Sequence, residues 1–116
     1  MTKLFQIGVT YPHEMKSGIG HIGMTLAGVN YECRGGKGVL RGSGARGATN
    51  KLFKHHFHML VPNSRAAAAK KWLDACVGTK YAFGGMQNPD RSPKRRGDCS
   101  GLVSGLPSTL QVPPLT

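Results

Sequence analysis

The sequence predicts a single α+β domain in which a small antiparallel sheet packs on two or three helices. The chain has 116 residues, enough for one hydrophobic core. Its 17 glycines and only 18% charged residues favour tight turns and close backbone packing over a bundle of long helices. We expect one domain over residues 1–116. A histidine-containing β half spans 1–62, and a half with the clearest helix and Cys99 spans 63–116.

The first half of the chain contains short apolar runs that are bounded by glycine or proline, and this pattern is typical of strands. Two of these runs flank a turn signal at Ala27-Gly28 or Gly28-Val29, which predicts a hairpin. The expected strands are residues 4–10, 21–26, 29–33 and 39–40.

The middle of the chain contains the clearest helix, about residues 65–77, with Asn63 or Ser64 as its cap and Gly78 as its end. Residues 49–58 before it are compatible with either a helical turn or a strand. Four apolar residues fall at helical spacing and predict a buried stripe: Ala69, Trp72, Leu73 and Cys76.

The net charge of the chain indicates which classes of partner it would attract. A formal charge of +11 predicts attraction to polyanions such as nucleic acid, anionic membrane or anionic cell-wall polymer. Basic residues are spread along the chain, and the one tight cluster at 91–96 has no interleaved aromatic residues, which argues against nucleic acid. The apolar runs predict neither a membrane span nor a signal peptide. Three cysteines, an odd number, argue for a reduced protein.

The pattern around Cys99 predicts an activated cysteine. Asp98 and Ser100 are both good residues for the start of a helix, and apolar residues follow them. Unpaired backbone N–H groups and the helix dipole favour a thiolate over a thiol at that position.

A cysteine nucleophile needs a base and a group that orients the base. His21 follows Gly20 at a strand start, and the expected hairpin brings Glu32 beside it, so Glu32 is a candidate orienting carboxylate. The spacing alone supports a second interpretation equally well. In it, His21 is a half-buried strand residue and Glu32 is a surface charge. Three other histidines crowd one segment, where solvated or half-buried positions are common: His55, His56 and His58.

Neither a metal nor another cofactor is predicted. Histidines 55, 56 and 58 and Cys33 offer possible ligands, but no CxxC or HExxH spacing is present. The glycine-rich basic stretch at 34–47 contains Arg34 and Arg46 but lacks the GxxxxGK[ST] pattern of a phosphate-binding loop.

Two stretches resemble the NlpC-type cysteine peptidases, which are papain-like enzymes that cut peptide bonds in bacterial peptidoglycan stems. Residues 81–85 (YAFGG) and 98–103 (DCSGLV) resemble the family signature YxxGG…DCSGLV. Residues 20–23 (GHIG) and 32–39 (ECRGGKGV) resemble the HxG…ExRGGxGV variant found in actinobacterial phage tape-measure and lysin polypeptides.

The resemblance implies a papain-like fold with Cys99 as nucleophile, His21 as its base and Glu32 as the orienting residue. It also implies a peptidoglycan stem peptide as substrate, an acyl-enzyme intermediate and an anionic cell-wall polymer as partner. The protein would be associated with a phage virion, or made in the host cytoplasm and delivered to the wall. The residues expected in the substrate and oxyanion region are Tyr81, Asp98, Ser100 and Gly20.

The sequence departs from the family in ways that keep a second interpretation open. The histidine half precedes the cysteine half, so the fold would be circularly permuted, and Gly105 and Pro107 shorten the expected cysteine helix. A catalytically inactive virion or tail module, associated with other phage tail proteins, retains the fold in this interpretation.

Overall fold

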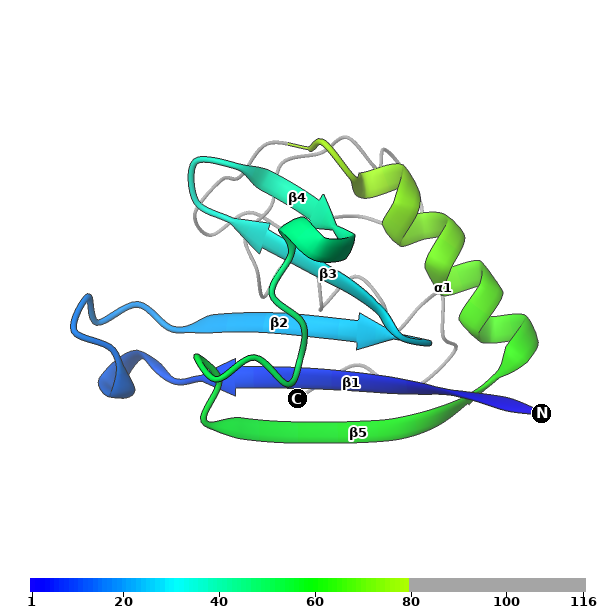
Figure 1. The fold of residues 1–116 in the computed structure, drawn as a ribbon, viewed down its shortest axis with the longest axis horizontal. Helices are drawn as coiled ribbons and strands as arrows, with labels where there is room; N and C mark the ends of the chain where they lie inside the picture. The colour runs from blue at the N-terminus through cyan, green and yellow to red at the C-terminus, as the bar shows by residue number, and fades with distance from the viewer. Residues whose placement is uncertain (80–116) are drawn as a thin grey trace.

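A computed structural model of the chain describes residues 1–79 (Figure 1). Tyr81, Asp98, Cys99 and Ser100 lie outside the described residues. In chain order the elements are β1 (Thr2–Thr10), the 3₁₀ turn η1 (Pro12–Glu14), β2 (His21–Leu26), β3 (Val29–Arg34), β4 (Gly38–Arg41), the 3₁₀ turn η2 (Gly42–Gly44), β5 (His55–Pro62) and α1 (Asn63–Cys76).

The five strands form one antiparallel sheet in the order β4-β3-β2-β1-β5. All four predicted strands are present, to within two residues at either end. The ambiguous stretch at 49–58 forms turns and then enters β5 at His55. Together with α1, the sheet confirms an α+β domain, with one α-helix within residues 1–79.

The predicted hairpin forms between β2 and β3, where Met24 lies opposite Tyr31 and Leu26 lies opposite Val29. Ala27 and Gly28 make the turn with φ values of 50° and 83°. Two successive positive φ values are the conformation of a tight hairpin turn whose twist matches that of the strands.

The predicted helix cap was wrong. Helix α1 begins at Asn63 itself, and Pro62 occupies the cap position without a side-chain hydrogen bond. The reason is that β5 ends at Pro62, so the chain passes from extended backbone into the helix without a separate capping turn. The helix ends at Cys76, and Gly78 follows with φ of 89°, a conformation that suits glycine.

Helix α1 buries its predicted stripe against one face of the sheet. It runs from the end of β5 toward β4 (Figure 1). The stripe is buried as expected, and strand residues such as Met24, Tyr31 and Val39 are almost fully buried in the same core cluster. With 14 residues, α1 is too short to cross a membrane, and no other helix of residues 1–79 is long and apolar enough.

The opposite face of the sheet is covered by residues 42–54, here named the crossing segment. Strands β4 and β5 lie at opposite edges of the sheet, so the chain between them must cross the other strands. Figure 1 shows it passing over β2 and β1. It buries Phe53, which is 3% exposed, over Gly8 and Gly23, two glycines directly opposite each other on β1 and β2.

The glycine pair leaves room for the Phe53 ring. A Cβ atom added at Gly8 would lie 2.7 Å from Cδ2 of Phe53, and one added at Gly23 would lie 2.7 Å from its Cζ. Any side chain at these positions would therefore displace the aromatic ring and the crossing segment with it.

Gly8→Ala tests this packing. We expect a loss of about 1–3 kcal/mol in the free energy of unfolding, as is typical of overpacked sites, measured by urea denaturation. Gly44→Ala is the matched control, because nothing lies within 4 Å of its added Cβ atom, and it should stay within about 0.5 kcal/mol of the parent. Equal effects of the two substitutions would contradict the packing described here.

Candidate active site

The hairpin brings His21 and Glu32 together, as the sequence analysis expected for a catalytic pair. His21 begins β2 and Glu32 lies on β3, and His21 Nε2 is 2.5 Å from Glu32 Oε2. Continuing the observed register places Gly23 opposite Glu32. A Cβ atom added at Gly23 would lie 2.7 Å from the Arg46 backbone oxygen, so Gly23 lets the Arg46 backbone approach the strand next to this pair.

Glu32 is a buried carboxylate surrounded by donors. It is 0% exposed, and its Oε1 accepts a hydrogen bond of 2.9 Å from the backbone N–H of Arg46. Two guanidinium groups face it: Arg46 Nε lies 3.2 Å from Oε2 and Arg34 Nε lies 3.7 Å from Oε1. A buried carboxylate requires such hydrogen-bond donors and opposite charges to remain ionised.

These partners decide the ionisation of Glu32. Burial by itself would raise the pKa of the carboxyl, but the hydrogen bonds from His21 and from the Arg46 backbone, with the Arg46 charge, hold that pKa below its usual value. Glu32 is therefore an anion at neutral pH.

An anionic carboxylate fixes the tautomer of His21. A carboxylate only accepts hydrogen bonds, so the Nε2 atom that faces Glu32 must carry the proton. In the neutral ring Nδ1 then holds the lone pair, and it is the atom that would take a proton from a thiol.

The plane of the His21 ring is set by Phe53. The two rings are stacked with centroids 5.7 Å apart and an angle of 17° between their planes. Because Phe53 is itself held over Gly8 and Gly23, the imidazole is supported on one side by a ring that packs directly on the sheet. The His21 side chain remains 15% exposed, so solvent reaches part of it.

The structure brings together only some of the predicted site residues. Gly20 directly precedes His21 and packs closely: an added Cβ atom would lie 2.7 Å from the Thr10 backbone oxygen. Cys99, the predicted nucleophile, lies outside the described residues with Tyr81, Asp98 and Ser100.

The other two cysteines are buried. Cys33 is 1% exposed and Cys76 is 0% exposed, and both belong to the core cluster under α1. Burial raises the pKa of the Cys76 thiol to about 11, which disfavours the nucleophilic thiolate. Both cysteines therefore suit packing positions better than catalytic ones.

Three of the remaining histidines lie on β5. His55 Nε2 is 2.9 Å from Glu14 Oε1, and its ring lies against Tyr11 with centroids 4.6 Å apart. His56 Nδ1 is 2.9 Å from the Ala48 backbone oxygen, and His58 is exposed. Within residues 1–79 no three His, Cys, Asp or Glu side chains gather as a metal site would require.

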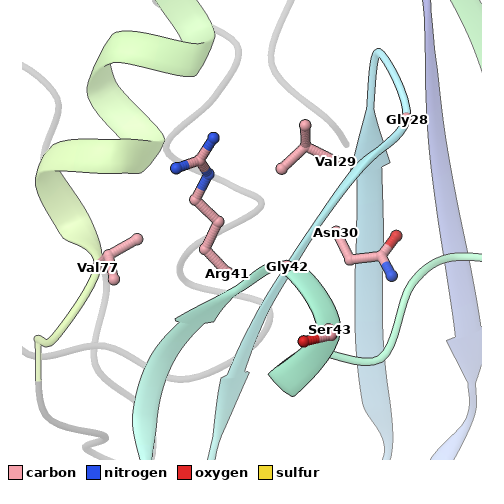
Figure 2. Close-up of a pocket in the computed structure, with 7 residues that line it drawn as sticks. All are labelled: Gly28, Val29, Asn30, Arg41, Gly42, Ser43 and Val77. Carbon is pink, nitrogen blue, oxygen red and sulfur yellow. The ribbon is translucent and has the colours of Figure 1, made fainter.

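An open pocket of about 630 Å³ lies at the other end of the strands from His21. Figure 2 shows Arg41 reaching between Val77, after α1, and Val29, at the start of β3. The Arg41 guanidinium is 3.3 Å from Asp74, so its charge is already partnered. The pocket is separate from the His21–Glu32 pair.

Two contacts of the site were not foreseen from the sequence. Arg46 lies in the basic glycine-rich stretch that was considered for phosphate binding, and Phe53 lies in the stretch with ambiguous secondary structure. The chain has 16 Lys and Arg residues and only five acidic residues, and no spacing in the sequence selects Arg46 as the partner of Glu32.

The chain was compared with models of known protein families, with curated proteins and with solved structures, and none of the three comparisons found a match.

The pH dependence of stability tests the ionised state of Glu32. Its folded pKa lies below the unfolded value, so the carboxylate contributes stability that is complete above about pH 4.3 and is lost as pH falls through the folded pKa. Glu32→Gln should be less stable than the parent by about 2 kcal/mol at pH 7, because it weakens the charge-assisted hydrogen bonds to His21 and to the Arg46 backbone.

This deficit should shrink as the pH is lowered from 5 to 3, as followed by urea denaturation of both proteins. Other carboxyl groups are common to the two proteins and cancel in the difference. A deficit that stays constant over this range would show that Glu32 is not held as an anion.

Proposed function

We propose that the protein is a cysteine peptidase in which His21 is the base for Cys99 and Glu32 orients His21. One observation carries this proposal: the Nε2 atom of an imidazole at the start of a strand lies 2.5 Å from a fully buried carboxylate, and the imidazole remains partly exposed. Burial of a carboxylate is costly for stability, and buried charged groups that contact a partly exposed histidine are typical of functional sites.

The reaction is an acyl transfer. The Cys99 thiol gives its proton to Nδ1 of His21, and the thiolate attacks the peptide carbonyl carbon. The imidazolium then returns the proton to the leaving amine as the C–N bond breaks, which leaves a thioester. Water attacks the thioester with His21 as base, releasing the carboxylic acid and the thiol. Glu32 holds the same tautomer through both steps.

The proposed fold and substrate rest on the sequence resemblance together with this pair. We infer a papain-like domain in permuted order, since a catalytic triad depends on geometry and not on the order of its residues in the chain. The substrate class is the peptidoglycan stem peptide, and the charge of +11 suits an anionic cell wall. The resemblance to phage tape-measure and lysin peptidases supports a virion-associated enzyme, or one delivered to the wall from the host cytoplasm.

Substitution of the two reacting residues tests the proposal. Cys99→Ala and His21→Ala should each reduce peptidoglycan hydrolysis by about 10³-fold or more, and equally, because members of a triad act as a unit. Release of soluble stem peptides, followed by mass spectrometry, is the measurement. His58→Ala is the matched control, since His58 is exposed on β5, and it should keep parental activity.

Retained activity in Cys99→Ala would remove Cys99 from the mechanism. A folded parent protein without activity on any peptidoglycan chemotype would favour the other interpretation, a structural module of a phage virion or tail.

A further inference from the structure

We propose that Arg46 is a positioning residue: its backbone N–H and its guanidinium together hold the Glu32 carboxylate in the orientation that accepts the His21 proton. This inference rests on the proposed function, because it gives Arg46 a role in the work of the His21–Glu32 pair. Arg46 makes no contact with a reacting atom in this account and acts through Glu32.

Arg46 contacts both oxygens of the carboxylate. Its backbone N–H donates to Oε1 at 2.9 Å, and its guanidinium Nε lies 3.2 Å from Oε2, the oxygen that also faces His21. A carboxylate held at both oxygens cannot rotate about its terminal torsion without breaking one of these contacts. The direction of the lone pairs that receive the His21 proton is thereby fixed.

The backbone of Arg46 is itself fixed on the hairpin that carries the pair. The Ala48 N–H donates to Thr25 Oγ1 at 2.9 Å, and Thr25 Oγ1 in turn donates to Asn30 Oδ1 at 2.9 Å. Gly47 lies so close to Asn30 that an added Cβ atom would collide with the amide. These contacts anchor the crossing segment to β2 and β3 at the two residues that follow Arg46.

Arg34 provides the internal comparison. It carries the same charge and faces the same carboxylate, and its side chain is 32% exposed against 31% for Arg46. Its Nε is 3.7 Å from Oε1, beyond hydrogen-bond distance. Within residues 1–79 the titratable or charged groups that face Glu32 are His21, Arg34 and Arg46, and of the two arginines Arg46 makes the closer contact.

The test compares Arg46→Gln with Arg34→Gln, which remove one charge each from the same carboxylate. The first readout is the ¹⁵N spectrum of the His21 imidazole, which reports the ring nitrogen that carries the proton. We expect the parent and Arg34→Gln to show the Nε2–H form, and Arg46→Gln to show a mixture of tautomers. The backbone ¹H–¹⁵N spectrum reports whether each variant is folded.

The second readout is hydrolysis of peptidoglycan. We expect Arg46→Gln to lower kcat by about 100-fold with little change in KM, as misplacement of a catalytic group does. Arg34→Gln should lower kcat by less than about 5-fold, as expected for a partly exposed ion pair. Arg46→Lys keeps the charge without the planar guanidinium and should recover only part of kcat. Arg46→Lys also provides the test of the positioning role if Arg46→Gln does not fold.

The two readouts separate this inference from the proposed function. If the parent is inactive but Arg46→Gln alone changes the His21 tautomer, the proposed function fails and the positioning role stands. An unchanged tautomer and kcat in Arg46→Gln would overturn the positioning role. Full recovery by Arg46→Lys, or equal losses in the two glutamine variants, would also overturn it, because charge alone would then suffice.

Discussion

The burial of one carboxylate is the constraint on which the site depends. Glu32 is fully buried on β3, and a buried charge persists only where donors and opposite charge replace the water it has lost. His21 and Arg34 come from the hairpin itself, but the closest guanidinium belongs to Arg46 in the crossing segment. Glu32 is therefore one of the contacts that tie the crossing segment to the sheet.

The strand order makes this arrangement possible. Because β4 and β5 lie at opposite edges, the chain must return across the face of the sheet that α1 leaves uncovered. Paired glycines at 8 and 23 let that return lie close to the sheet, and Phe53 fills the space above them. The same ring stacks on His21, so packing and hydrogen bonding orient the imidazole from two directions.

Local features of this structure could be predicted from the sequence, and features that depend on strand order could not. The His21–Glu32 pair follows from a tight hairpin, because its turn and register are set within a few residues. The roles of Arg46 and Phe53 depend on where the crossing segment passes, and this is set by the distant pairing of β5 with β1. The prediction of a helix cap at Asn63 or Ser64 was wrong, because the extended backbone of β5 continues through Pro62 directly into the helix. Residue propensities alone do not reveal that a strand ends next to the helix.

The reactivity of Cys99 is the first property to measure, because it reports whether the oriented imidazole meets a thiol. The measurement is the pH dependence of iodoacetamide alkylation, with the modified cysteine located by mass spectrometry. We expect selective labelling of Cys99 with a midpoint well below about pH 8.5, which is lost in His21→Ala, while the buried Cys33 and Cys76 react slowly. Slow and uniform labelling of all three cysteines would contradict it.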